Sequence, residues 1–224
     1  LLDHTMPSKR LSLGEVESLS SRAARGFGFD WGMAEEVGYS ARILAQHGFD
    51  SAGLLTKYLM SDVAMQTILN RTSQPAAQLG QCPFICGIGI SDFYLTQSGL
   101  ANQPVCVNSV RFSAFLLPFL SRLSTKYDVC IKIDIGTHLF YCDQGLIGTL
   151  SETEARFSND PNLAPNIVLT KENARVARIT ARKIASINVS EKTITMLEGW
   201  MHRTLVPASD ASRQGAGAAG SDNL

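Results

Sequence analysis

The sequence predicts an α+β fold, with an N-terminal helical bundle followed by an antiparallel sheet and a closing C-terminal helix. Three observations support this prediction. Apolar residues recur at helical spacing through residues 11–69, and side chains alternate with a period of two from Val129 to Ile135. Near the end, Ser190 and Glu191 are typical of a helix N-terminus and precede a further apolar stripe.

Three helices are expected in the bundle. Ser12 begins the first, because Glu15 three residues later completes a capping box. Asp30 caps the second, which Gly48 ends, and the third runs over 51–69. The stripe of the first helix has steps of three and four residues and consists of Leu13, Val16, Leu19, Ala23 and Phe27. Short connections between the three helices predict an antiparallel bundle.

The middle of the chain is less regular. Glycines and prolines punctuate residues 72–104, which are expected to form buried loop or short helix. Large apolar residues then recur at helical spacing over 112–123. Pro118 lies inside this helix and, because it lacks a backbone N–H, should kink it.

The second half is expected to form the sheet and the last helix. Residues 143–145, Asp-Gln-Gly, favour a hairpin turn. Residues 172–183 fit a strand pair better than a helix, and both remain open. The closing helix runs over 190–203. The expected strands are 129–135, 139–142, 146–150 and 167–169.

One domain is expected, and its ends differ in composition from its centre. It should cover residues 11–213, with a helical-bundle part over 11–72 and a mixed part over 73–213. Residues 1–10 are expected to form a flexible extension, and 214–224 a tail of Gly, Ala and small polar residues. Such a tail buries too little apolar surface to order itself, although its glycines would also permit close contact with a partner.

The charge balance limits the expected partners. The chain has 20 basic and 20 acidic residues and a formal net charge of zero. This removes the electrostatic basis for phosphate-dominated binding, so no nucleic acid is expected. A small-molecule carboxylate or a partner protein subunit is favoured, and we expect a homo- or hetero-oligomer.

Cysteine usage and hydropathy indicate the compartment. The five cysteines are an odd number at irregular spacings, without a Cys-x-x-Cys pair or a histidine at ligand spacing. Neither a disulfide framework nor a metal site is expected, and a reducing cytoplasm fits best. No window offers roughly 18 uninterrupted apolar residues, so neither export nor a membrane span is predicted.

The chain resembles a bacterial family catalogued as domain of unknown function 3726. The resemblance is carried by residues 12–27, by Trp-Gly-x-Ala-Glu-Glu at 31–36, and by the closing segment 203–217 with its Ser-x-x-Ser-Arg-x-Gly-Ala-Gly end. It extends over nearly all of the chain. The family carries no established activity, so the resemblance implies one domain and a cytoplasmic bacterial setting but assigns no catalytic residue.

Residues 13–55 also resemble the helical start of the type 2 malate and lactate dehydrogenase family, which includes sulfolactate dehydrogenases. That family has an arginine, four residues, then His-Gly, and Arg42, His47 and Gly48 keep this spacing. The resemblance implies that Arg42 binds a substrate carboxylate, that His47 donates a proton to a keto group, and that the cofactor is NAD or NADP. The Asp-Ser before the family's histidine is Ala-Gln here.

Other candidate residues have a structural and a functional interpretation. Gly87 and Gly89 fit buried loop packing better than a phosphate cradle, since no third glycine follows at dinucleotide spacing. Cys82 would be a nucleophile only if a histidine lay close to it. His138 and His202 fit ordinary surface or packing histidines better than functional ones.

Two functions from different classes follow. The first is an enzyme of small-molecule catabolism, or a module derived from one, which acts on a carboxylate-bearing metabolite. In it His47 is catalytic, Arg42 and Arg213 bind the substrate carboxylate, and no metal takes part. The alternative is a non-catalytic subunit that docks on a catalytic partner through exposed apolar surface and its C-terminal tail.

Overall fold

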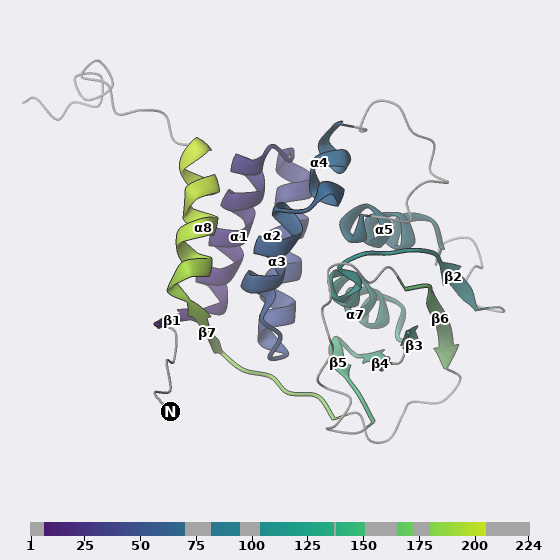
Figure 1. Cartoon of the computed structure of the whole chain (residues 1–224). Coiled ribbons are helices and arrows are strands. Elements are labelled where there is room, and N and C mark those ends of the chain that lie inside the picture. The colour runs from purple at the N-terminus through teal and green to yellow at the C-terminus, as the bar shows by residue number, and fades with distance from the viewer. Residues whose placement is uncertain are drawn as a thin grey trace, which may run out of the picture.

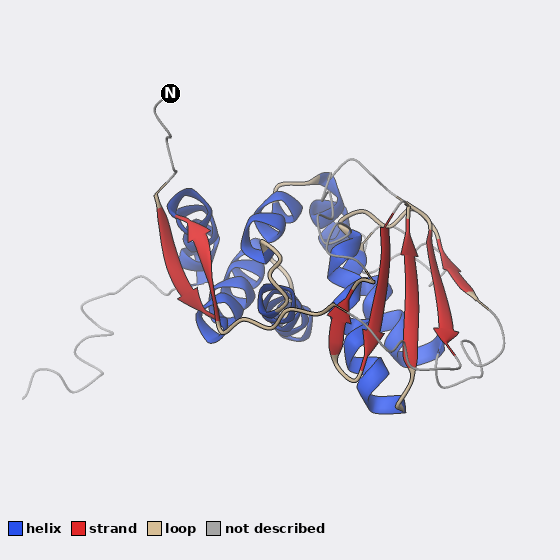
Figure 2. Cartoon of the chain, turned by 90° about the horizontal axis from the view of Figure 1, so that it is seen from below, coloured by secondary structure: helices blue, strands red, loops and turns tan. Residues whose placement is uncertain are grey.

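The protein folds into two lobes that share one apolar core (Figure 1). The computed structural model describes residues 7–69, 82–94, 104–136, 138–150, 165–172 and 180–204. One lobe is helical, and the other is an antiparallel sheet with helices on one face (Figure 2). This arrangement confirms the predicted α+β class, with helices first, then the sheet, then a closing helix.

The helical lobe is built around its first helix, α1. Helix α1 contacts both α2 and α8, and α3 packs against α1, α2 and α8 (Figure 1). The helices of this lobe are α1 (Leu13–Phe27), α2 (Trp31–Gln46), α3 (Ser51–Leu59), α4 (Asp62–Leu69) and α8 (Glu191–Met201).

Side-chain caps fix where these helices begin, as the sequence predicts. Ser12 Oγ accepts the Glu15 N–H at 3.3 Å, and Glu15 Oε2 accepts the Ser12 N–H at 2.8 Å. This is the predicted capping box, which satisfies two backbone donors that a helix N-terminus leaves unpaired. Asp30, Asp50 and Ser190 each accept a backbone N–H in the first turn of α2, α3 and α8.

The third predicted helix, 51–69, is two helices rather than one. The break falls between Leu59 and Asp62, the end of α3 and the start of α4. The Tyr58 carbonyl oxygen accepts both the Ser61 N–H at 2.9 Å and the Ser61 hydroxyl at 2.6 Å, so Ser61 closes a tight turn at the end of α3. Serine competes in this way with the helical hydrogen-bond pattern, and the pattern of apolar residues does not reveal it.

The extension expected over 1–10 is in part a strand. β1 (Ser8–Ser12) pairs antiparallel with β7 (Ser186–Ser190), so Ser8 lies opposite Ser190. Each of these two strands leads directly into a helix, α1 and α8, which lie side by side. The closing helix therefore belongs to the helical lobe and not to the mixed part predicted for 73–213.

The sheet lobe holds a five-stranded antiparallel sheet. Its strand order is β2-β6-β3-β4-β5, so β3, β4 and β5 form the predicted meander. The strands are β2 (Val105–Val107), β3 (Cys130–Ile135), β4 (His138–Asp143), β5 (Leu146–Gly148) and β6 (Ile167–Glu172). The helices are α5 (Pro83–Gly89), a π-helix η2 (Ile90–Tyr94), a 3₁₀-helix η3 (Ser113–Leu116) and α7 (Leu117–Tyr127).

One face of this sheet forms the apolar core with α7. The Cys142 thiol lies on that face and contacts the Leu117 carbonyl oxygen at 3.6 Å. Because strand side chains alternate, the residues in register with Cys142 share its face. These residues are buried and include Ile131, Ile133, Phe140 and Leu169.

Two local predictions in this lobe have different outcomes. A hairpin turn is predicted over 143–145, and the structure forms it with two residues, Gln144 and Gly145, at φ values of 50° and 76° between β4 and β5. Pro118, in contrast, does not kink a long helix. It lies in the first turn of α7, where a missing N–H leaves no helical bond unmade, and η3 precedes it.

Some predicted segments lie outside the described residues. These are 1–6, the tail 214–224, and residues 173–179 of the segment predicted as a strand pair or a helix. Thr180, which is described, forms an isolated antiparallel bridge with Thr149. The chain then crosses from the sheet lobe to β7 in the helical lobe.

Glycines permit the closest helix contacts. A Cβ at Gly26 would lie 1.8 Å from the Trp200 carbonyl oxygen, so α1 and α8 meet backbone to backbone. A Cβ at Gly87 would lie 2.3 Å from the Phe119 ring, where α5 packs on α7. Neither glycine is needed for its φ angle, and each is needed because an added methyl group would overlap the neighbouring helix.

We predict that Gly26→Ala destabilises the protein, because α8 must move to admit the methyl group. The expected loss of unfolding free energy is about 1–3 kcal/mol. Gly14→Ala in the same helix is the matched control, since nothing lies within 4 Å of its Cβ position. It should be neutral or stabilising by up to about 1 kcal/mol. Urea denaturation measures both, and equal stabilities would contradict the packing argument.

Candidate functional site

Arg42, the predicted carboxylate-binding residue, is paired within the protein. It lies on α2, and its Nε is 3.0 Å from Glu17 Oε2 on α1. Its guanidinium carbon is 5.6 Å from the centroid of the Tyr39 ring. The charge of Arg42 is therefore matched by a carboxylate of the neighbouring helix, and the two side chains hold α1 and α2 together.

A second arginine contacts the same tyrosine. Arg122 of α7 forms two hydrogen bonds of 3.1 and 3.0 Å with the Glu36 carboxylate of α2. Its guanidinium carbon lies 4.9 Å from the Tyr39 ring centroid. Burial raises the pKa of the Tyr39 phenol. This bidentate pair is a link between the helical lobe and the sheet lobe.

His47, the predicted proton donor, ends α2 and is only 8% exposed. Its Nδ1 is 2.9 Å from the Ile43 carbonyl oxygen, and its Nε2 accepts the Ile147 N–H at 3.2 Å. The ring is therefore neutral, with its proton on Nδ1. Burial, which disfavours the charged form, lowers the pKa of His47.

The structure does not bring Arg42 and His47, the two predicted site residues that it describes, to one place. Arg42 and His47 lie five residues apart on α2, and they face Glu17 and Ile147, which belong to different lobes. A substrate carboxylate would have to displace Glu17, and proton donation from His47 would break a backbone hydrogen bond. Arg213 lies outside the described residues.

The other candidates have packing roles or remain predictions. Gly87 and Gly89 belong to α5, which confirms buried packing at Gly87. Cys82 is buried, with its Sγ 3.2 Å from the Tyr58 hydroxyl. His138 begins β4, and His202 is exposed at the end of α8.

Tyr58 is the centre of an aromatic cluster that joins the lobes. Its buried ring contacts those of Phe84 and Phe112 edge-on, at centroid distances of 5.2 and 5.4 Å. Burial raises the pKa of the Tyr58 phenol and raises that of Cys86 to about 12. A thiol with so high a pKa is inert at neutral pH. The rings and thiols here form core rather than a reactive centre.

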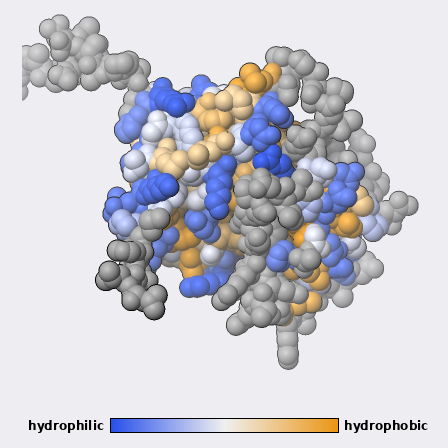
Figure 3. Space-filling view, in the orientation of Figure 1, coloured by the Kyte–Doolittle hydropathy of each residue, from blue (hydrophilic) through white to orange (hydrophobic). Residues whose placement is uncertain are grey.

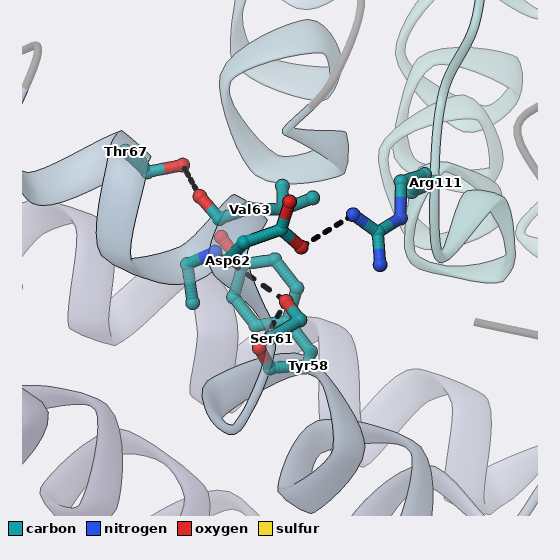
Figure 4. Close-up of polar contacts among 7 residues, drawn as sticks. Tyr58, Ser61, Asp62, Val63, Thr67 and Arg111 are labelled. Carbon is teal, nitrogen blue, oxygen red and sulfur yellow. Dashed lines mark hydrogen bonds and ion pairs between the residues drawn. The ribbon is translucent and has the colours of Figure 1, made fainter. Parts of the chain in front are cut away.

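Next to this cluster, an ion pair connects α4 with the segment before η3. Arg111 Nη1 lies 2.5 Å from Asp62 Oδ1, and this bond lowers the pKa of Asp62 (Figure 4). Phe112 has a φ of 54°, which is rare for a bulky side chain. The contact of Phe112 with Tyr58 and the ion pair of Arg111 hold this backbone conformation in place.

Large apolar side chains are exposed where α4 meets the turn between α1 and α2. A Cβ at Gly28 in this turn would lie 3.1 Å from Ile68 of α4, so the two elements touch. Figure 3 shows hydrophobic surface at the outer end of α4. We call these four residues the bundle-end patch: Trp31 (68% exposed), Met60 (65%), Met65 (50%) and Leu69 (68%).

The described residues contain neither a membrane-spanning helix nor a cluster of potential metal ligands. No helix in the described ranges is both long enough and apolar enough to cross a bilayer. Among the same residues, no three His, Cys, Asp or Glu side chains are grouped so that they could hold a metal ion.

The first part of the chain matches the model of a known family. A family model described as "Protein of unknown function (DUF3726)" matches residues 11–81. The match includes α1 to α4 and ends before α5. Neither a curated protein nor a solved structure matches the chain significantly. The likeness to the uncharacterised family therefore rests on the first helices of the helical lobe.

Sequence reasoning missed the bundle-end patch. Met65 and Leu69 lie four residues apart within the segment predicted as one continuous helix, where they add to its general hydrophobicity. Their spacing places them on a single face of α4, and the structure shows that both are exposed. The signal available was the Met-Ser-Asp sequence at 60–62, which is typical of a helix start.

We predict that Tyr58→Phe lowers the unfolding free energy by about 1 kcal/mol, because the Cys82 thiol loses its hydroxyl partner while the aromatic packing remains. Tyr58→Ala should cost about 3–5 kcal/mol, since it empties a fully buried site. Urea denaturation measures both. Tyr127→Phe, at a half-buried ring on α7, should change stability by less than about 0.5 kcal/mol. A large effect of the control would contradict the central role of Tyr58.

Proposed function

We propose that the protein is a non-catalytic interaction module that binds a partner protein through the bundle-end patch. The observation that carries this proposal is the exposure of Trp31, Met60, Met65 and Leu69 on adjoining elements of one end of the helical lobe. Single exposed apolar residues are ordinary, but grouped ones are typical of interaction surfaces.

The chemistry of the patch supports a protein partner. Tryptophan, methionine and arginine are enriched in the centres of protein interfaces. The Arg25 guanidinium lies 4.8 Å from the Trp31 ring centroid, which holds the exposed indole in a defined position. Methionine side chains adapt to irregular apolar surfaces because they are unbranched and polarisable.

The geometry of α4 indicates the kind of surface that fits. Met65 and Leu69 are one helical turn apart and form a short ridge on the outer side of α4. The inner side carries Val63 and Ala64, which are buried. A ridge of this kind packs into the groove of another helix, so the proposed partner presents the apolar face of a helix.

The proposal also includes a family and a cellular location for the chain. We place the whole chain in the DUF3726 family of bacteria, which the match over 11–81 supports. A cytoplasmic location is supported by the free thiols of Cys82, Cys86, Cys106, Cys130 and Cys142. The neutral net charge favours an apolar contact over a charged one, so binding should depend little on salt.

The enzyme hypothesis makes a different prediction. If Arg42 binds a metabolite, keto or hydroxy acids with either nicotinamide should raise the melting temperature, and Arg42→Ala should abolish that shift. A docking module gives no such shift with any member of the panel. A shift that disappears in Arg42→Ala would replace the docking proposal by the catalytic one.

We predict that a photo-crosslinking amino acid at position 65 captures a specific partner in cells of the source organism, whereas one at position 150 does not. Leu150 is the matched control, because it is exposed and apolar but lies in the sheet lobe. With the captured protein purified, Trp31→Ala or Leu69→Ser should weaken binding at least tenfold by calorimetry, and Leu150→Ser should not.

Two outcomes would contradict docking at the bundle-end patch. One is equal capture at positions 65 and 150. The other is a dissociation constant that Trp31→Ala and Leu69→Ser leave unchanged. Melting curves of each variant should match that of the unmodified protein, since these side chains contact solvent rather than the core.

A further inference from the structure

The edge strand of the sheet is closed by a histidine of the other lobe. β5 is the last strand in the sheet order, so one of its sides has no strand beside it. On that side the Ile147 N–H donates to His47 Nε2, and Thr149 exchanges two backbone hydrogen bonds with Thr180, of 2.8 and 3.3 Å. Unpaired backbone groups at a sheet edge are costly when buried, and here an imidazole takes the place of a strand.

We propose that His47 is a pH-sensitive link between the lobes, in which protonation of Nε2 releases β5 from the end of α2. A protonated ring presents an N–H where Ile147 also presents an N–H, so the bond cannot form in that state. The inference stands independently of the bundle-end patch, since it concerns the opposite end of α2.

The hydrogen bond of His47 Nδ1 leaves the ring proton no alternative position. Nδ1 faces the Ile43 carbonyl oxygen, which can accept a hydrogen bond but cannot donate one. A flipped tautomer would lose both bonds at once. The neutral ring with its proton on Nδ1 is thus the one state that satisfies Ile43 and Ile147 together.

The charges around the ring oppose a second positive charge. We call residues 180–185, which lead from the sheet lobe to β7, the crossing segment. The charge of Lys183 in this segment repels a positive charge on His47, and the Arg182 side chain lies near Gly48. β5 carries no ionisable side chain, and Asp50, which follows His47 closely, is committed to capping α3. Burial and Lys183 both disfavour the imidazolium and lower the pKa of His47 in the closed state.

Protonation of His47 should open only the contact between β5 and the end of α2. Beside His47, the Ile184 N–H donates to the Gln46 carbonyl oxygen at 2.8 Å, so the crossing segment is bound to the same end of α2. The aromatic cluster around Tyr58 holds the lobes together elsewhere. Loss of the His47 bond therefore frees β5 from the end of α2 without separating the cores.

The sign of the pH dependence follows from the lowered pKa. Once opened, His47 is hydrated and titrates near its ordinary value of about 6.5. The closed state is favoured fully above this value and loses its advantage as the pH falls toward the lower pKa of the closed state. Across that window, each fall of one pH unit should raise the population of the open state by up to about tenfold.

Native-state amide hydrogen exchange followed by NMR tests the proposal on the full chain. Between pH 7 and pH 5.5, after correction for intrinsic exchange rates, the amide of Ile147 should lose protection by up to about tenfold. The amides of Ile133 in β3 and Val37 in α2 should keep theirs. His47→Gln, which does not titrate, should abolish the pH dependence, and His202→Gln at an exposed site should leave it unchanged.

Four results would overturn the proposal. Protection at Ile147 that stays constant over this pH range would do so, as would a loss shared equally by Ile133 and Val37, which reports global unfolding. If His47→Gln does not fold, the ring ¹⁵N signals of the unsubstituted protein decide. A proton on Nε2 at neutral pH, or a ring titration with no change at Ile147, would exclude the link.

Discussion

The packing of the two lobes against each other depends on the burial of Tyr58. Its ring extends from α3 into a site formed by Phe84 of α5, Phe112 before η3, and Phe115 within η3. On its other side, it stacks with Phe29, which follows α1. Large aromatic side chains dominate core energetics, so one residue on a short helix makes the helical lobe and the sheet lobe a single packing unit. The remaining contacts between the lobes orient them around this point.

Those remaining contacts are polar and differ in kind. The Asp62–Arg111 and Glu36–Arg122 pairs lie at partly exposed sites, where ion pairs contribute little to stability. The bond from Ile147 to His47 is buried, and losing a partner there costs more because water cannot replace it. The arginine pairs therefore mainly fix the relative position of the lobes, whereas the histidine bond closes an edge of the sheet.

The predictable part of the fold is the part set by neighbours in sequence. The capping box at Ser12, the turn at Gly145 and the alternation through β3 all depend on residues within a few positions of each other, and each was predicted. The pairing of β1 with β7 brings distant residues together, and the Arg10 side chain donates a hydrogen bond to Ser186 Oγ, 176 positions away. No local pattern encodes this pairing. His47 was predicted as a catalytic residue, and its partner Ile147 lies 100 positions away, so no local pattern encodes that contact either.

The bundle-end patch and the His47 link lie at opposite ends of one helix. Trp31 begins α2 and His47 ends it, about 24 Å away at 1.5 Å per residue. A continuous helix moves as a rigid body, yet rigidity alone does not couple two sites, because coupling needs an element with two arrangements that both sites bias. The structure contains such an element at the His47 end, where β5 is either bound or released. At the Trp31 end, the patch is a surface of fixed helices, so partner binding and the pH response should be energetically independent.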